Sequence, residues 1–222
     1  MLKKYEDALR VKLVSCTQPI IDEADNLDEL IAFCARVSNP ANQANKETAD
    51  KLVQYLIKHK HWSPLDMADA TMEISTTRDI GRQALRHQSF KFQEFSQRYA
   101  EAQEFVLREA RMQDTKNRQN SLICVDEELQ EWWAAAQELV IFAAKRAYEQ
   151  ALAKGIAKEQ ARVVLPEGLT MSRLYMKGSI RSWIHYLEVR RDESTQKEHR
   201  MLAVAIAEAI SQITNLVKPP AS

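Results

Sequence analysis

Residues 71–99 read TMEISTTRDIGRQALRHQSFKFQEFSQRY, and this stretch contains the patterns on which the fold prediction rests. Over residues 71–77, apolar Met72 and Ile74 alternate with polar neighbours, as they do in a strand that is buried on one face. Asp79 can cap a helix that continues to about His87. The stretch therefore predicts a strand that is followed directly by a helix, whereas residues 88–100 show no clear period.

The flanking sequence predicts mostly helices. Only 4 glycines occur in 222 residues, and long stretches rich in Ala, Glu, Lys and Leu favour helix over an all-β fold. Asp126 is a suitable N-cap for a long helix that ends near Lys154, before Gly155. Periodicity predicts a strand over 9–17 and further helices over 27–38, 47–59, 157–164, 179–190 and 195–217.

The overall composition limits the classes of protein to be considered. A length of 222 residues suits one domain, residues 1–222, and a net charge of zero gives no general attraction to nucleic acid or to anionic membranes. Cys16, Cys34 and Cys124 lack CxxC spacing, so we expect neither disulfides nor a metal site. The first residues show no apolar h-region and the sequence has no 18-residue apolar run, so we expect a cytoplasmic protein with neither a secretory leader nor a membrane span.

Residues 78–98 form a basic segment within this neutral protein. Arg78, Arg82 and Arg86 lie four residues apart and therefore share one helix face. The segment has five basic residues against two acidic ones, a local charge of +3. Arginine forks suit phosphate oxygens, although a solvated basic face with ordinary ion pairs is the alternative. Four aromatic residues in this part of the chain could be core residues or could stack on flat rings: Phe90, Phe92, Phe95 and Tyr99.

The same segment resembles a family signature. Arg86-His87-Gln88 is followed by seven residues and then by Ser96, with Arg98-Tyr99 just beyond and Glu94 two residues before the serine. This arrangement is similar to the signature of flavin-dependent thymidylate synthases, which is Arg-His-Arg, seven residues and Ser. The third signature position is Gln88 instead of Arg, which removes a cation but keeps hydrogen-bond donors.

Four further segments resemble the same family in the same order. They are ARVS at 35–38, HWSP at 61–64, ARVVLP at 161–166 and SIRSWIHYLEVR at 179–190, where Ser63 and Ser179 replace a frequent Thr and a frequent Asn. One short motif is weak evidence, but five motifs in order are strong evidence. The resemblance implies an α/β (α+β) fold with a mixed sheet and long flanking helices. It also implies a homotetramer with sites shared between chains.

The resemblance further implies an activity, in which dUMP is methylated to dTMP with FAD as cofactor, NADPH as reductant and methylenetetrahydrofolate as carbon donor. Arg190 falls on the position of the family's catalytic arginine. The positions implied for cofactor binding are His61, Ser63, Arg86, His87, Gln88, Glu94, Ser179, Ile180, Arg181 and His185. The positions implied for substrate binding are Gln83, Ala84, Leu85, Arg86, Glu94, Phe95, Ser96, Gln97, Arg98, Arg162 and Arg190.

The segment 179–190 also has a pattern of its own. A buried stripe is predicted for Ile180, Trp183, Ile184 and Leu187, beside a polar stripe of Arg181, His185 and Glu188. Such a helix can line a cleft, although a polar stripe is more often a solvent face. His59 and His199 have no partner that spacing reveals, so we predict surface positions for both. One of Trp132 and Trp133 is expected in the core.

Two other functions remain open at this point. The first is a helical RNA-binding module that uses the basic and aromatic residues of 78–98. The second is a degenerate family member that binds dUMP without turnover, which Gln88 and Ser179 suggest. We expect a flavin and no nucleic acid partner if the family activity is retained.

Overall fold

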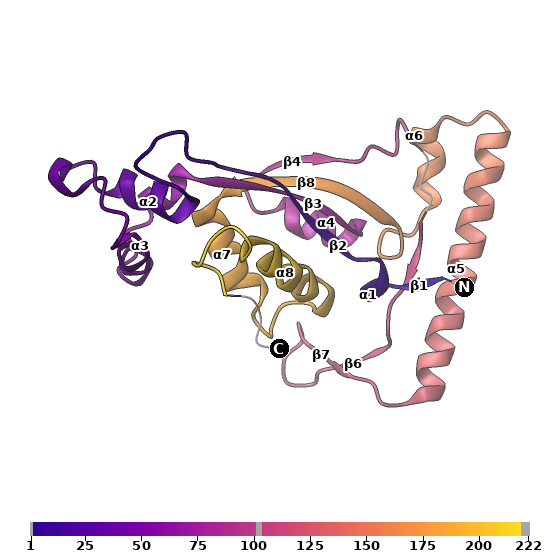
Figure 1. The fold of residues 1–222 in the computed structure, drawn as a ribbon. Helices are drawn as coiled ribbons and strands as arrows, with labels where there is room; N and C mark the ends of the chain where they lie inside the picture. Colours follow the sequence, from indigo (N-terminus) through magenta and orange to yellow (C-terminus); the bar gives the residue numbers. More distant parts are fainter. Residues whose placement is uncertain (1, 101–103, 219–222) are drawn as a thin grey trace.

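The computed structural model describes residues 2–100 and 104–218. Its centre is a four-stranded sheet with the strand order β2-β3-β8-β4 (Figure 1). These strands are β2 (Arg10–Cys16), β3 (Asp69–Thr77), β8 (Met171–Ser179) and β4 (Lys91–Glu94). All three pairings in this sheet are antiparallel. The α+β class is therefore confirmed, but parallel pairing occurs only between the short strands β1 (Lys3–Lys4) and β5 (Val106–Leu107) among the described residues.

One face of the sheet is buried and the other is polar. Met72 and Ile74 of β3 are fully buried, and they pair with Met176 and Leu174 of β8, which are also fully buried. On the opposite face the Tyr175 hydroxyl donates a 2.6 Å hydrogen bond to the Glu73 carboxylate. The alternation predicted for 71–77 is therefore confirmed, and it extends along β8.

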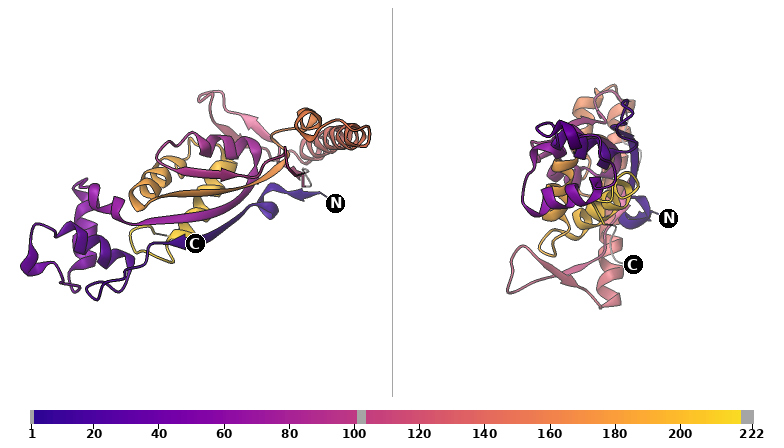
Figure 2. Two further views of the ribbon diagram at one scale, coloured as in Figure 1. Left: turned by 90° about the horizontal axis from the view of Figure 1, so that it is seen from above. Right: turned by 60° about the vertical axis from the view of Figure 1, so that its left-hand side comes forward.

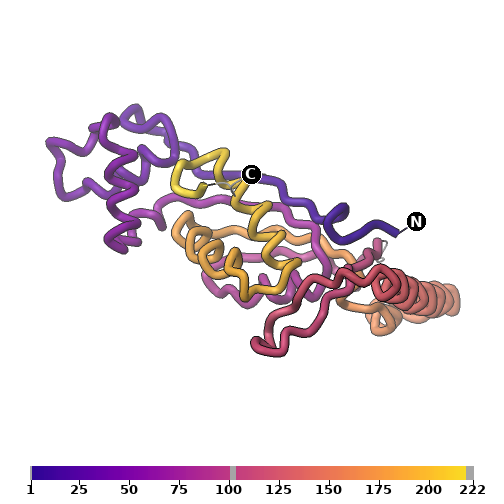
Figure 3. Tube along the Cα trace, turned by 90° about the horizontal axis from the view of Figure 1, so that it is seen from below, coloured from indigo at the N-terminus to yellow at the C-terminus, as the bar shows by residue number. Residues whose placement is uncertain are grey.

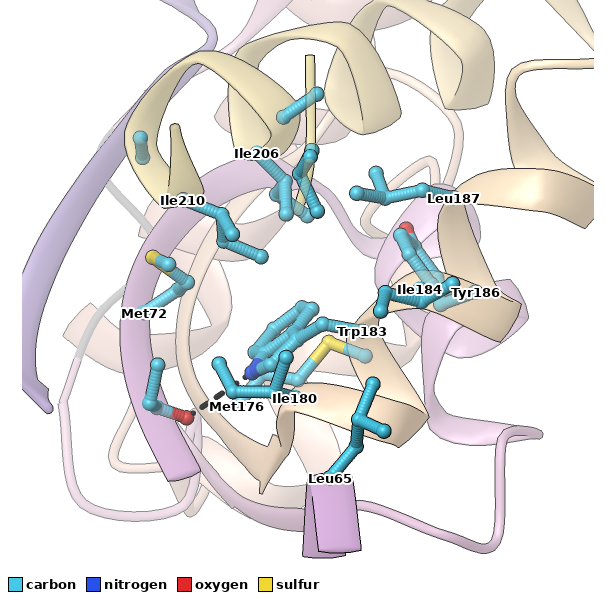
Figure 4. Packing of buried hydrophobic residues seen from close by; sticks show 14 of the residues in the cluster. Leu65, Met72, Met176, Ile180, Trp183, Ile184, Tyr186, Leu187, Ile206 and Ile210 are labelled. Atoms are coloured by element: carbon cyan, nitrogen blue, oxygen red, sulfur yellow. Dashed lines mark hydrogen bonds between the residues drawn. The ribbon is translucent and has the colours of Figure 1, made fainter. Parts of the chain in front are cut away.

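Three helices cover the buried face: α4 (Arg78–Leu85), α7 (Ile180–Arg190) and α8 (Lys197–Ile210) (Figures 1 and 4). The predicted stripe of α7 is buried, and the Trp183 indole N–H donates a 3.2 Å hydrogen bond to the carbonyl of Ala70 in β3. The last helix ends at Ile210 and not near 217. Beyond it, the amide of Asn215 donates a 2.9 Å hydrogen bond to the carboxylate of Asp28, which directs the chain away from a helical course.

A smaller helical layer lies at one end of the sheet (Figures 2 and 3). It contains α2 (Leu27–Ala35), the short helix η1 (Pro40–Asn42), α3 (Ala49–Lys58) and the short helix η2 (Ser63–Met67). Asn26 caps α2 by accepting a hydrogen bond from the amide of Glu29. The side chain of Arg36, which follows α2, donates to the carbonyl of Asn45 and to the Thr48 hydroxyl, and these bonds fix the 39–48 connection.

The long helix α5 (Glu127–Ala153) extends at the other end of the molecule (Figure 1). As predicted, Asp126 caps it, and Gly155 follows it with a positive φ of 81°. The predicted helix 157–164 is divided into α6 (Lys158–Ala161) and the short helix η3 (Arg162–Val164). Both Trp132 and Trp133 are exposed, so the prediction that one lies in the core is wrong.

The remaining elements are short. They are α1 (Tyr5–Ala8) near the beginning of the chain and a hairpin of β6 (Arg111–Gln113) and β7 (Ser121–Ile123) that precedes α5. Within the described ranges, no helix has both the length and the apolar character needed to cross a bilayer.

Candidate active site

Helix α4 follows β3 without a loop and carries two rows of polar side chains. Its N-cap is Thr77, which makes no side-chain cap hydrogen bond, so the prediction that Asp79 caps this helix is wrong. Asp79 instead accepts hydrogen bonds of 2.8 and 2.7 Å from the guanidinium group of Arg108. Arg78 and Arg82 form one row. The helix ends at Leu85 and not near His87 as predicted, so the other row consists of Gln83 on α4 and His87 just beyond its end.

The row of Arg78 and Arg82 borders an arginine pocket of about 220 Å³. The pocket is lined by Arg78, Arg82, Gln97, Arg162, Val163, Leu165 and Glu167. Arg82 pairs with Glu167, and Arg78 lies 3.6 Å from Glu94. Three arginines against one lining carboxylate give the arginine pocket the character of an anion site.

Gln97 gives independent evidence that this pocket takes a polar ligand. Its side chain is buried, and its amide nitrogen has no hydrogen-bond partner among the described residues. A buried unpaired donor is costly, and because Gln97 lines the arginine pocket, an acceptor bound in the pocket is a candidate partner for it. The predicted substrate residues Gln97 and Arg162 therefore meet here. Arg78 and Arg82 were missing from the predicted site, although their spacing had indicated a shared face.

Other residues of the signature segment lie around this pocket. The Ser96 hydroxyl accepts a 3.3 Å hydrogen bond from the amide of Arg98, whose side chain is exposed and lies 3.3 Å from Glu159. Glu94 also accepts a 3.3 Å hydrogen bond from the Ser172 hydroxyl. The half-buried Phe95 is fixed through its amide, which donates to the carbonyl of Arg173 at 2.8 Å.

The aromatic residues of the segment divide between the core and solvent. Phe90 is 4% exposed, and Phe92 packs against the same core. Tyr99 is 83% exposed. Phe90 and Phe92 therefore have a structural role, and Tyr99 is the aromatic side chain of this group that is free to meet a ligand or a second chain.

The second row of α4 meets the end of α7. Arg190 Nε donates a 2.9 Å hydrogen bond to His87 Nε2, and the His87 ring packs edge-on against Tyr186 at 4.9 Å. Burial lowers the pKa of His87, and the nearby cations Arg190 and Arg86 lower it further. A neutral His87 can therefore accept this bond, which fixes the guanidinium group of Arg190 beside His87.

The side chain of Gln83 is held in place by the buried His199 and by Gln196. Its amide oxygen lies 3.0 Å from His199 Nδ1, and its amide nitrogen donates a 2.8 Å hydrogen bond to Gln196. His199 is 0% exposed, so the prediction of a surface position is wrong, whereas His59 is exposed as predicted. The predicted substrate residue Ala84 is fully buried in the core, and its neighbour Leu85 is half-buried.

A third group of predicted residues gathers where η2 meets the start of α7. Ser179 caps α7, and its hydroxyl donates a 2.7 Å hydrogen bond to Asp66. Arg181 donates to the same carboxylate at 3.0 Å, and the rings of Trp62 and His185 contact each other at 4.4 Å. We call this group the η2–α7 cluster, and the exposed His61 and Ser63 border it in sequence.

The η2–α7 cluster has groups that fit a flavin. A half-buried aromatic pair, a half-buried arginine and the exposed hydroxyl and imidazole groups of Ser63 and His61 suit a flat ring system that carries phosphates. Ile180 differs from this group, because its side chain lies in the core and its amide donates to the carbonyl of Ala68. The two remaining residues predicted to bind the cofactor, Arg86 and Gln88, are exposed just beyond the end of α4.

Comparisons with known proteins agree with this arrangement. The family model described as thymidylate synthase complementing protein matches residues 19–214. The probable flavin-dependent thymidylate synthase of Paramecium bursaria Chlorella virus 1 is 51% identical over 201 residues, which is 90% of this chain and 93% of the relative. The flavin-dependent thymidylate synthase of Synechocystis sp. is 54% identical over 198 residues, 88% of this chain and 91% of the relative.

A solved structure shows the same fold. It is the crystal structure of a UMP/dUMP methylase PolB from Streptomyces cacaoi bound with 5-Br dUMP, with a TM-score of 0.81 and 24% identity over 96% of this chain and 92% of that chain. The family match over residues 19–214, together with two relatives above 50% identity, agrees with the signature at 86–99. The chain therefore belongs to the family of flavin-dependent thymidylate synthases.

Proposed function

We propose that this flavin-dependent thymidylate synthase converts dUMP to dTMP, with FAD as cofactor, methylenetetrahydrofolate as carbon donor and NADPH as reductant. The observation that carries the proposal is the arginine pocket along α4, together with the group of Gln83, His87 and Arg190 that forms where the end of α4 meets the end of α7. A nucleotide needs a cationic site for its phosphate and directed donors for its base. These two sites suit the two ends of dUMP.

The residues that could hold the phosphate line the arginine pocket, and they are Arg78, Arg82, Arg162 and Gln97. The pocket thus combines three cations with a buried amide donor, the Gln97 nitrogen, that has no hydrogen-bond partner within the described residues. Arg98 and Ser96 adjoin this site, and we propose that Arg98 exchanges Glu159 for the nucleotide when dUMP binds.

Arg190 is the candidate catalytic residue. The reduced flavin, when bound, supplies the hydride for the reaction. As negative charge grows on the uracil ring, the guanidinium fork of Arg190 stabilises it, and neutral His87 holds the fork in place through Arg190 Nε. Gln83 presents an amide N–H beside it and orients the ring.

The η2–α7 cluster is the candidate flavin site. Arg181, His185, Ser63 and His61 supply cationic and hydrogen-bonding groups, with Ser179 and Asp66 holding Arg181 in position. We also propose that residues 1–222 form one catalytic domain, that the enzyme is a cytoplasmic homotetramer and that sites are shared between chains. The apolar side chains that α5 exposes support the assembly.

The visible spectrum of the purified protein, followed by an assay for dTMP, tests this proposal. We expect bound oxidised flavin and formation of dTMP that needs dUMP, methylenetetrahydrofolate and NADPH together. A protein that neither copurifies with flavin nor binds added FAD, but binds RNA in a salt-sensitive manner, would be the RNA-binding module. A protein that binds flavin and dUMP without forming dTMP would be a degenerate member of the family.

A further inference from the structure

His199 lies in a chain of hydrogen bonds that is buried at His199 and Tyr186 and reaches the surface at Gln196. Its Nε2 is 2.9 Å from the Tyr186 hydroxyl, and its Nδ1 is 3.0 Å from the amide oxygen of Gln83. The chain continues from the Gln83 amide nitrogen to the Gln196 amide oxygen at 2.8 Å. It ends where the Gln196 amide nitrogen donates to the Glu198 carboxylate at 2.9 Å. We call these five residues the Gln83 chain.

The carboxylate at the end fixes the direction of every bond in the Gln83 chain. An ionised carboxylate only accepts, so Gln196 must turn its NH2 group towards Glu198 and its oxygen towards Gln83. Gln83 must then turn its NH2 group towards Gln196 and its oxygen towards His199. His199 therefore carries its proton on Nδ1, and its Nε2 accepts from the Tyr186 hydroxyl.

A neutral ring at position 199 is required for this arrangement. Burial lowers the pKa of His199 to about 3, and the nearby Arg190 and His87 contribute to the shift. The ring thus has one proton to donate near neutral pH, and the direction of the chain assigns this proton to Nδ1.

The geometry points to His199 as a positioning residue that fixes the carboxamide of Gln83 so that it offers an N–H donor to a carbonyl oxygen of the pyrimidine ring. The Gln83 NH2 group has two hydrogens, and Gln196 takes one of them. The second hydrogen is left over by the bonds of the Gln83 chain, and Arg190 and His87 lie close enough to His199, the partner of Gln83, to lower its pKa. Two donors then face the base, which favours carbonyl oxygens over an exocyclic amino group.

This inference rests on the proposed function, because it assigns a task to a residue of the proposed dUMP site. A pair of nearly isosteric substitutions tests it. In His199→Asn the side-chain NH2 group occupies the position of Nδ1, whereas His199→Leu places a methyl group there. Tyr186→Phe is the control, because it removes a buried hydroxyl but leaves the bond between His199 Nδ1 and Gln83 intact.

The measurements are the dissociation constant of dUMP on the purified holoenzyme, kcat, KM and the flavin content of each variant. We expect His199→Leu to weaken dUMP binding about 3- to 10-fold, as the loss of one oriented hydrogen bond does, mostly through KM. His199→Asn should recover most of this loss, and Tyr186→Phe should keep the affinity of wild type despite a lower melting temperature. Flavin content should stay at the wild-type level throughout.

The outcomes distinguish the inference from the function on which it rests. If wild type binds dUMP and His199→Leu binds it equally well, the positioning role is overturned and the proposed function stands. The role is also overturned if His199→Asn and His199→Leu are equally impaired, or if Tyr186→Phe loses as much affinity as His199→Leu. A wild-type holoenzyme that does not bind dUMP overturns the proposed function, and the inference with it.

Discussion

Arg190 is positioned by one hydrogen bond from its Nε to His87, and among the described residues the rest of its guanidinium fork makes no other hydrogen bond. We predict that Arg190→Ala lowers kcat by about 10²- to 10³-fold, as the loss of one donor to a developing negative charge does. Arg190→Lys should also be poor, because it keeps the charge but loses the planar fork. Single-turnover formation of dTMP with saturating dUMP measures the effect.

A neighbour of the same type provides the control for Arg190. Arg191 is exposed and donates to the carbonyl of Lys218, away from His87. Arg191→Ala should therefore keep the wild-type rate. If Arg190→Ala forms dTMP as fast as wild type in a single turnover, Arg190 has at most a binding role.

In contrast to Arg190, which we expect to act on the chemical step, Arg162 should contribute to the binding of dUMP. It lines the arginine pocket, and a lost charge-assisted hydrogen bond costs about 1.5–3 kcal/mol, or roughly a tenfold to over a hundredfold increase in the dissociation constant for dUMP. Arg98→Ala should raise this constant less, because Arg98 is exposed and pairs with Glu159. Isothermal titration with dUMP tests both, with Arg118→Ala on the exposed hairpin as control. Unchanged binding in Arg162→Ala would remove the arginine pocket from the dUMP site.

Buried His199 predicts a dependence of stability on pH. Its pKa in the folded protein is about 3, below the ordinary value of 6.5, so between these values unfolding takes up a proton. Stability is therefore fully present above about pH 6.5 and falls as the pH falls towards 3, by at most about 1.4 kcal/mol per pH unit from this group. His87, whose pKa is also lowered, contributes in the same direction.

Urea unfolding at several pH values checks this dependence, with flavin and protein concentration held constant. His199→Asn should show a shallower loss of stability below pH 6.5 than wild type, since one titrating group has been removed. Equal slopes for the two proteins would mean that His199 does not take up a proton on unfolding.

At the scale of elements, Gly178 lets strand β8 pass directly beneath the ring of Phe90. A Cβ atom at this position would lie 2.5 Å from two ring carbons of Phe90, which is closer than real Cβ atoms approach. Phe90 is 4% exposed and packed against Trp183 at 4.5 Å between ring centroids, so it has little room to move. Gly178→Ala should therefore destabilise the protein by about 1–3 kcal/mol, measured by urea unfolding.

Gly168 gives the matching control for this substitution. The nearest atom to a Cβ there is a carboxylate oxygen of Asp79 at 3.9 Å, which is an ordinary contact. Gly168→Ala should leave stability nearly unchanged, and Phe90→Leu should relieve part of the cost of Gly178→Ala. Equal stability of the two alanine variants would refute the steric explanation.

The elements also show what sequence could and could not predict. Helix α5 was predicted with both ends because Asp126 and Gly155 are local signals, and α7 because its stripe is periodic. Strand β4 was missed, since its four residues are held by pairing with β8, about eighty residues further along the chain. The end of α8 was missed because the carboxylate of Asp28, far away in sequence, binds the chain that follows it.

The sequence likewise predicts some residues of the candidate site and not others. The resemblance to the family implies Gln97 and His87 through the signature at 86–99, and Arg162 and Arg190 through the later segments. The structure brings Gln97 together with Arg162, and His87 together with Arg190. The resemblance could not reveal that Arg78 and Arg82 complete the arginine pocket, which depends on the placement of η3. Nor could it place His199, whose partner Gln83 lies more than a hundred residues earlier.

At the scale of the whole molecule, α5 exposes large apolar side chains that a solvated helix rarely carries. Trp132, Leu139 and Phe142 are 62%, 69% and 65% exposed. Such a surface is typical of an interface, and we propose that a second copy of the chain covers it. Phe142→Glu should therefore lower the mass of the assembly measured by light scattering, because it places a charge in an apolar contact.

The control for this prediction lies on the same helix. Gln150 is exposed and polar, so Gln150→Glu introduces the same residue outside the apolar stretch and should keep the assembly of wild type. An unchanged mass for Phe142→Glu would exclude this part of α5 from the interface.

The position of α8 has a consequence for the synthesis of the protein. Strand β2 and helix α8 come from opposite ends of the chain, yet Leu202, Ile206 and Ile210 of α8 fill the same core that Val11 and Leu13 of β2 contact. At about 5–20 residues per second, a ribosome completes α8 roughly ten to forty seconds after β2 emerges. Throughout that interval the part of the buried face that α8 covers, next to β2, stays exposed. If translation stops before Lys197, we expect the released chain to aggregate and to depend on chaperones. This is expected even though the proposed catalytic residue, Arg190, has already been made.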